Sequence, residues 1–147
     1  MIRNTHALKM LQDMAQKDVD MATQALADAM KMMQEAESKY ELLLNYRNDY
    51  HQSLHQSLES GIGAQAYQNF LGFFKKLDQA VKGQLEMVQM AKQQVQLQQK
   101  RWQESQRKKL SYGVLSQRHE QRHHKVMLKK DQQSMDEFAM RSSRHSK

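Results

Sequence analysis

The residues whose types and spacing could support chemistry are His119-Glu120-Gln121-Arg122-His123, which match the pattern H-E-x-x-H. On a helix, two histidines four positions apart share one face and can bind zinc, while the glutamate acts as the general base of a metalloprotease. Arg118, Arg122 and Lys125 surround this motif with positive charge, which repels a dication. No apolar stretch around it would close a cleft. We therefore expect no metal site, no cofactor and no catalytic residue here.

The rest of the sequence offers no other catalytic pattern. It contains no nucleophile triad, glycine-rich phosphate loop or paired-carboxylate pocket, so we expect a protein that is not an enzyme. The chain has no cysteine, which excludes disulfides and suits a reducing compartment. No apolar run approaches the roughly 20 residues that span a bilayer, and Met1–His6 lacks the hydrophobic stretch of a signal peptide. We expect a cytoplasmic protein.

Two long helical segments are predicted from apolar residues that recur at alternating spacings of four and three. Proline is absent, and therefore nothing prevents very long helices. Such heptads are typical of coiled coils. The first segment has apolar residues at all of these positions except Arg47: Ala15, Val19, Ala22, Leu26, Ala29, Met33, Ala36, Tyr40, Leu43, Arg47, Tyr50 and Leu54. The second is interrupted by two glutamines: Tyr67, Phe70, Phe74, Leu77, Val81, Gln84, Val88, Ala91, Val95, Gln98 and Trp102. We call these two rows of positions the seam.

The glycines at 61 and 63 mark the point where the chain reverses, because glycine tolerates the backbone conformation that ends a helix. We expect an all-α fold: a long two-helix antiparallel coiled coil, or helical hairpin, with an overhanging C-terminal helix. The expected bounds within one domain, residues 1–147, are a helix at about 5–58, a turn at about 59–63, a helix at about 64–140 and a polar tail at 141–147.

Folding the chain back at Gly61 pairs residue i with about residue 123 − i. This register places Ala22 opposite Trp102, so that a small side chain meets a large one. It also places Arg47 beside Asp78, where an ion pair would offset the charge in the seam. The paired part of the second helix would end near residue 118. The rest of that helix would continue beyond the start of the first helix.

Aromatic residues gather near the turn, and two of them are not needed by the seam. Tyr46 and Phe73 lie beside the seam positions, where large side chains are expected to stay partly exposed. Exposed aromatic patches are typical partner sites. Local stiffening near the turn is the alternative explanation, and we favour the partner site because the aromatics concentrate here.

Positive charge is confined to one segment. Residues 1–99 carry a net charge of −1 and residues 131–147 are balanced, whereas residues 100–130 carry +8. A basic helix of this kind can follow nucleic-acid phosphates, meet an acidic protein surface or contact anionic lipid. A solvated helix face is the commonest role of such a run. Few aromatics accompany the cations, which disfavours a nucleic-acid site.

The segment from Leu43 to Gln84 resembles the FliJ family of the bacterial flagellar type III protein export apparatus. The matching residues stand at the family's spacings: Leu43, Tyr46, Tyr50, Leu54, Gly61-Ile62, Tyr67, Phe70, Phe73, Leu77 and Ala80-Val81. The run Met135-Asp136-Glu137-Phe138-Ala139, followed by Arg141, is similar to the family's C-terminal signature. With the opening residues Ala7-Leu8 to Val19, the resemblance covers nearly the whole chain.

The resemblance implies a non-enzymatic, stalk-like coiled coil that binds the ring of the export ATPase FliI and the export gate FlhA and that recycles export chaperones. Such a protein is peripherally associated with the inner membrane at the flagellar base, through the gate alone. Carried over position by position, the gate surface comprises Leu43, Tyr46, Tyr50, Phe73, Leu77 and Ala80. Two further positions, Lys39 and Gln84, differ from the family's residues. The expected ATPase contact comprises Lys108, Lys109, Arg118, Arg122, Met135 and Phe138.

Two other functions remain open at this point. The stalk protein of a virulence-type secretion system shares the architecture and differs in its partners. A coiled-coil nucleic-acid-binding protein would use residues 100–130, and it would need its cations on one face of the helix.

Overall fold

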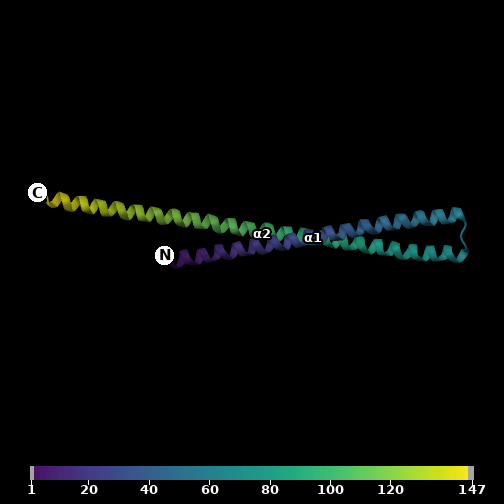
Figure 1. Ribbon diagram of the computed structural model, residues 1–147. Coiled ribbons are helices and arrows are strands. Elements are labelled where there is room, and N and C mark those ends of the chain that lie inside the picture. The colour runs from purple at the N-terminus through teal and green to yellow at the C-terminus, as the bar shows by residue number, and fades with distance from the viewer. Residues whose placement is uncertain (1, 146–147) are drawn as a thin grey trace. The chain divides into compact units, whose positions relative to one another are not determined.

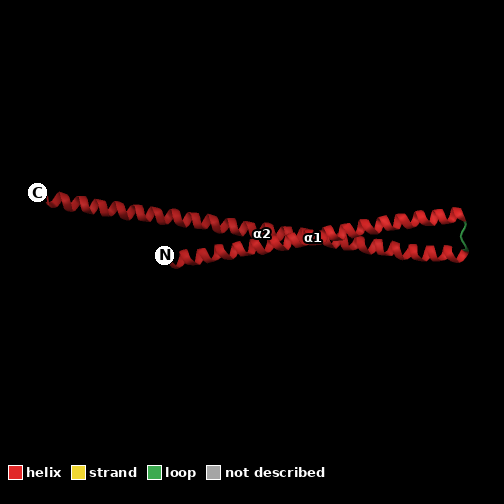
Figure 2. Cartoon of the chain, in the orientation of Figure 1, coloured by secondary structure: helices red, strands yellow, loops and turns green. Residues whose placement is uncertain are grey.

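A computed structural model describes residues 2–145 and contains two helices, α1 (Ile2–Ser60) and α2 (Ala64–His145) (Figures 1 and 2). Within that range every residue is helical except Gly61, Ile62 and Gly63, and no strand occurs. The two helices pack against each other, which confirms the expected all-α helical hairpin.

Both helices are longer than the sequence predicted. α1 already includes Ile2, whereas a start near residue 5 was expected, and α2 runs to His145 instead of ending near residue 140. Residues 141–145 of the expected polar tail are therefore helical. Neither proline nor glycine interrupts α2 after Gly113, so no residue in this stretch stops the helix.

The turn depends on the backbone of Gly61, whose φ of +79° lies in the left-handed region. This conformation is the usual end of a helix, and L-residues adopt it at a cost that glycine avoids. The Gly61 amide donates to the Leu58 carbonyl at 3.3 Å and closes the last turn of α1. Gly63 opens α2, because its carbonyl accepts from the Tyr67 amide at 3.1 Å.

The chain divides into two compact units, and both helices contribute to each. One unit is Met21–Gln103, which contains the turn and is called the turn unit below. The other combines Met1–Asp20 with Glu104–Lys147 and is called the terminal unit. The single-domain organisation expected from the sequence stays a prediction.

In the turn unit the core is the seam between α1 and α2. Its most buried side chains are Ala29, Leu54, Leu77, Val81 and Val88, with exposed fractions of 8% or less. Every seam position assigned to α1 is buried or half-buried, as predicted. On α2 the same holds for all assigned positions except Tyr67, which is 39% exposed. The assignment of Tyr67 to the seam was wrong, because this residue lies in the first turn of α2, directly after the chain reversal.

The contacts across the turn unit confirm the antiparallel register. Arg47 Nη1 donates to Asp78 Oδ1 at 3.2 Å, which is the ion pair expected at the break in the seam. Nearer to the turn, the rings of Tyr50 and Phe73 lie 4.6 Å apart between centroids. Further from it, Trp102 Nε1 donates to Thr23 Oγ1 at 3.1 Å. The residue numbers of these pairs sum to 123 or 125, close to the expected 123.

In the terminal unit the same row of positions continues with smaller and more polar residues. Ala15 and Val19 of α1 are buried, and Tyr112, Ser116 and His119 of α2 are half-buried at spacings of four and three. The seam positions assigned from the sequence end at Trp102, whereas half-buried positions at the same spacing occur again from Tyr112 to His119. From Glu120 to His145 every described residue is exposed. The last part of α2 has no helix beside it in this unit (Figure 1).

Candidate interaction sites

Aromatic rings of α1 and α2 pack against one another beside the turn, in the turn unit. Tyr50 of α1 lies between two rings of α2, with centroid distances of 5.2 Å to Phe70 and 4.6 Å to Phe73. Both ring pairs are tilted, a geometry that stabilises aromatic contacts beyond the area they bury. The next residue on each helix forms a further pair, with 5.8 Å between the ring centroids of His51 and Phe74. These rings pack across α1 and α2 and join the two helices at this end of the turn unit.

The six residues expected to bind the export gate differ in how much of each side chain reaches solvent. Tyr46 is 54% exposed and Phe73 is 41% exposed, while Leu77 is only 7% exposed. Leu43 and Tyr50 are half-buried, and Ala80 is exposed. The exposed members of this set, which we call the gate face, are therefore Tyr46, Phe73 and Ala80.

Helical spacing places the six residues expected to bind the export gate on a common side of the turn unit. Leu43, Tyr46 and Tyr50 follow one another at intervals of three and four on α1, so their side chains share a face. Phe73, Leu77 and Ala80 repeat the pattern on α2. The contact between Tyr50 and Phe73 joins the two rows across the helices.

The gate face is bordered by an open groove that the sequence analysis did not single out. Ala36 of α1 and Ala91 of α2 leave room between the helices, and Gln84 fills part of it by donating to the Ala36 carbonyl at 3.0 Å. Leu42 and Met87 line the groove with 68% and 57% of their surface exposed. These two residues could have been found from the sequence only after the register was fixed.

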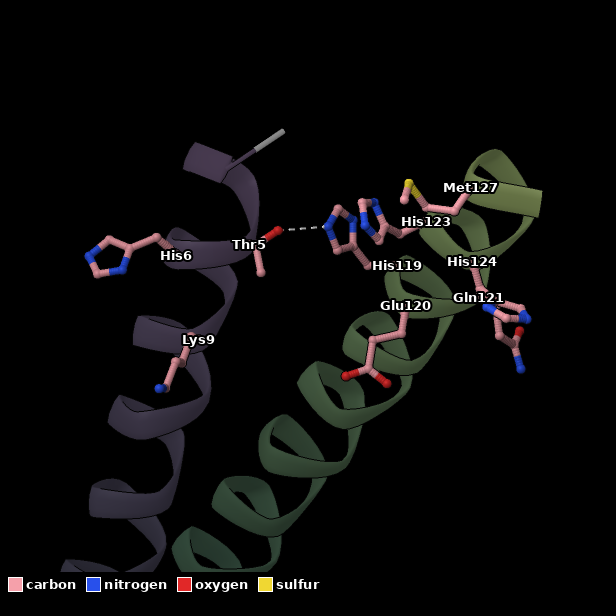
Figure 3. Close-up of a pocket in the computed structure, with 9 residues that line it drawn as sticks. All are labelled: Thr5, His6, Lys9, His119, Glu120, Gln121, His123, His124 and Met127. Carbon is pink, nitrogen blue, oxygen red and sulfur yellow. Dashed lines mark hydrogen bonds between the residues drawn. The ribbon is translucent and has the colours of Figure 1, made fainter. Parts of the chain in front are cut away.

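The H-E-x-x-H motif lies in the terminal unit, in an open groove that α1 and α2 line together. His119 is half-buried, and its Nε2 lies 3.0 Å from Thr5 Oγ1. Figure 3 shows His119 and His123 directed toward α1, whereas His6 and His124 point away from the space between the helices. Among residues 2–145 no three histidine, cysteine or acidic side chains come together as a metal site. The contact between His119 and Thr5 joins α2 to α1 in this groove.

The residues expected to contact the ATPase ring are all exposed, but they do not form one surface. Each residue of a helix turns by about 100°, so the neighbours Lys108 and Lys109 point in different directions. Arg118 and Arg122 are four residues apart and share a face. Met135 and Phe138 lie further along α2, with 69% and 73% of their surface exposed.

Two residues that the sequence analysis left out of the site extend the face of Arg118 and Arg122. Lys125 and Lys129 continue the spacing of three and four residues, so four exposed cations form a row along α2. We call Arg118, Arg122, Lys125 and Lys129 the cationic row. The ion pairs within the described part of the chain lie in the turn unit, and none involves the cationic row. Its charges are therefore available to a partner.

No helix in the described part of the chain has the length and apolar character needed to cross a membrane. This observation concerns residues 2–145 alone.

Comparison with known proteins identifies the family of this chain. Residues 4–147 match the family model described as the flagellar FliJ protein. Two curated relatives carry the same name, one from Salmonella typhi with 29% identity and one from Escherichia coli K12 with 27% identity. Each alignment covers 137 residues, which are 93% of this chain and 93% of the relative. The match spans both units and every residue of the gate face, and the chain belongs to the flagellar FliJ family.

Proposed function

We propose that this chain is a non-enzymatic component of the bacterial flagellar protein export apparatus, where it joins the export ATPase FliI to the export gate FlhA. Family membership supports the flagellar assignment over the stalk protein of a virulence-type system, because both curated relatives are named as flagellar proteins. The helical hairpin suits a stalk, which must transmit contacts along its length and needs no catalytic cleft.

The observation that carries the proposal is the exposure of Tyr46 and Phe73 at the margin of the seam, although Phe73 also packs on Tyr50. A tyrosine that is 54% exposed buries little surface in the free protein. Buried in an interface, such an aromatic side chain commonly contributes about 2 kcal/mol or more to binding. The export gate is the partner we assign to this face, with Leu43, Tyr50, Leu77 and Ala80 supporting the two aromatics.

The ATPase ring is assigned to the terminal unit. The segment of α2 after His119 is exposed along its whole described length. Helices in proteins gain most of their stability from tertiary packing, so an uncovered stretch of this length favours a partner. Lys108, Lys109, Arg118 and Arg122 would supply charge to that contact, and Met135 and Phe138 would supply apolar area. Recycling of export chaperones and a peripheral position in the cytoplasm at the flagellar base complete the proposal.

A binding comparison tests the proposal. Purified full-length protein is mixed in turn with FliI, with the cytoplasmic domain of FlhA and with duplex DNA at moderate salt, and complexes are detected by pull-down and titration calorimetry. We expect both export proteins to bind and DNA not to bind. Saturable DNA binding without binding of either export protein would replace the proposal with a nucleic-acid function of residues 100–130.

A further inference from the structure

The terminal unit carries a second groove. It lies on a different side of the helices from the groove lined by His123. Both helices line it, and its apolar and cationic residues come from opposite ends of the sequence: Ala7, Leu8 and Leu11 from α1, and Leu115, Arg118 and Arg122 from α2. We call this the terminal groove.

The floor of the terminal groove is apolar and uncovered. Leu11 is 40% exposed and Leu115 is 50% exposed, although each lies next to a covered position of the helix pair. Leu8, which also lines the groove, is half-buried. Apolar side chains from two helices that meet in a shallow groove form the kind of surface that an amphipathic helix covers with anchors three and four residues apart.

The rim of the terminal groove is cationic on the side of α2. Arg118 and Arg122 line the groove, and Lys125 and Lys129 extend the same face along the helix. No carboxylate in the described part of the chain forms an ion pair with these four residues. At a rise of about 1.5 Å per residue the row extends for roughly 16 Å. A matching row of carboxylates on a partner would find all four cations available.

We propose that the terminal groove binds an acidic amphipathic helix of a protein partner. Leucine-like anchors of that helix cover Leu11 and Leu115, and its carboxylates pair with Arg118 and Arg122, whose guanidinium groups hold carboxylates in a bidentate geometry. The proposal deepens the proposed ATPase contact, with which it shares Arg118 and Arg122, and adds α1 to that contact.

The chemistry of the groove favours a protein helix over other anionic partners. A nucleic-acid strand stacks its bases on aromatic side chains, and apart from the half-buried ring of His119 the groove offers it an aliphatic floor instead. A lipid surface binds one convex amphipathic helix, with its apolar face toward the bilayer. Here the apolar residues of two helices form a shallow concave surface, with the cations along one edge.

The test uses the full-length protein and a labelled helical peptide of about 20 residues, roughly 30 Å of helix. The peptide carries leucines at alternating spacings of three and four residues and glutamates on both flanks. A second peptide has lysine in place of every glutamate. Fluorescence anisotropy is expected to show binding of the acidic peptide alone, and binding is expected to weaken as salt rises.

Matched variants locate the binding site. Arg118→Glu with Arg122→Glu should weaken binding of the acidic peptide at least about tenfold, a loss of about 1.4 kcal/mol. Lys75→Glu with Lys76→Glu makes the same charge change at exposed residues of the turn unit and should alter affinity less than about twofold. Leu11→Gln should weaken binding, whereas Leu97→Gln, at a residue 42% exposed in the turn unit, should not. Circular dichroism of each variant checks that its helices are intact.

Equal losses in the groove variants and their controls would overturn the proposal, because they would show non-specific attraction to a basic protein. Duplex DNA or vesicles of anionic phospholipid that bind more tightly than the peptide, and that the same groove variants release, would assign the groove to that polyanion instead. FliI is titrated in parallel. If FliI binds the wild type and the Leu11→Gln variant equally, and the peptide does not bind, the groove proposal fails while the ATPase contact stands.

Discussion

Individual side chains in the gate face differ in what they contribute to the free protein. Tyr46 is 54% exposed, whereas the ring of Phe73 packs on Tyr50 at 4.6 Å. From the sequence alone the two appeared equivalent, because both lie beside the seam. The contact with Tyr50 makes Phe73 part of the helix packing as well as of the proposed interface.

Truncating these two aromatics should therefore have different effects on stability. Phe73→Ala should lower the free energy of unfolding by about 1 kcal/mol, since it removes the ring pair with Tyr50. Tyr46→Ala should change it by less than about 0.5 kcal/mol, as is usual for surface substitutions. Thermal unfolding followed by circular dichroism measures both. A large early loss of structure in Tyr46→Ala would mean that this tyrosine is part of the core.

The histidines of the H-E-x-x-H motif give a second prediction at this scale. Replacing His119 and His123 with alanine removes the contact with Thr5, and motility should be unchanged. Atomic absorption of the purified wild type should find no stoichiometric zinc, because the described residues offer no third ligand. Tight zinc that is lost in the double variant together with motility would restore the catalytic interpretation of the motif.

At the scale of single elements, two glycine variants in the turn separate the effect of one backbone angle on the stability of the hairpin. Gly61 has a φ of +79°, and a Cβ added at Gly61 or at Gly63 would meet no other atom within 4 Å. Gly61→Ala should therefore destabilise the hairpin by about 1–2 kcal/mol through backbone strain alone. Gly63→Ala should be neutral or stabilising by up to about 1 kcal/mol, because it restricts the unfolded chain. Equal melting temperatures of the two variants would contradict this account of the turn.

The seam should be separable from the gate face. Val88 is 4% exposed, and Val88→Ala should lower the free energy of unfolding by about 2 kcal/mol, in line with the burial of its side chain. Leu26→Ala in α1 should act in the same direction. The neighbouring Met87→Ala, at a residue 57% exposed, is the control for stability. Binding of the FlhA cytoplasmic domain should persist in Val88→Ala below its melting temperature, and loss of binding there would place the seam in the interface.

The last part of α2 should contribute binding and little stability. A chain ending after Lys130 loses residues that are exposed wherever the structure describes them, among them Met135 and Phe138. Its melting temperature should match that of the full chain, while its affinity for FliI falls. A lower melting temperature would reveal packing by this segment, and unchanged FliI affinity would remove Met135 and Phe138 from the ring contact.

The sequence predicted the parts of the hairpin that follow from side-chain periodicity. Its alternating spacing identified the seam from Ala15 to Leu54, and a turn at Gly61 gave an approximate register that places Arg47 near Asp78. It could not predict that Tyr67 would be exposed, since spacing assigns a residue to one face of its helix and does not report how closely the neighbouring helix covers it. The terminal groove was also missed, because Leu11 and Leu115 are brought together by folding alone.

For the whole molecule, the central claim is that two surfaces in different units serve different export partners. The gate face belongs to the turn unit and the cationic row to the terminal unit. A variant in one unit should therefore leave the binding of the other partner intact. Variants that merely unfold the chain would lose both partners together.

Titration calorimetry of two variants against two partners tests this claim most directly. Tyr46→Ala should weaken binding of the FlhA cytoplasmic domain by roughly thirtyfold or more, about 2 kcal/mol, and leave FliI affinity unchanged. Tyr67→Ala, a partly exposed tyrosine outside the gate face, is its control. Arg118→Glu with Arg122→Glu should do the opposite, reducing FliI affinity and sparing FlhA. If both variants weaken both partners equally, or if Tyr46→Ala leaves the FlhA affinity unchanged, the assignment of separate surfaces is wrong.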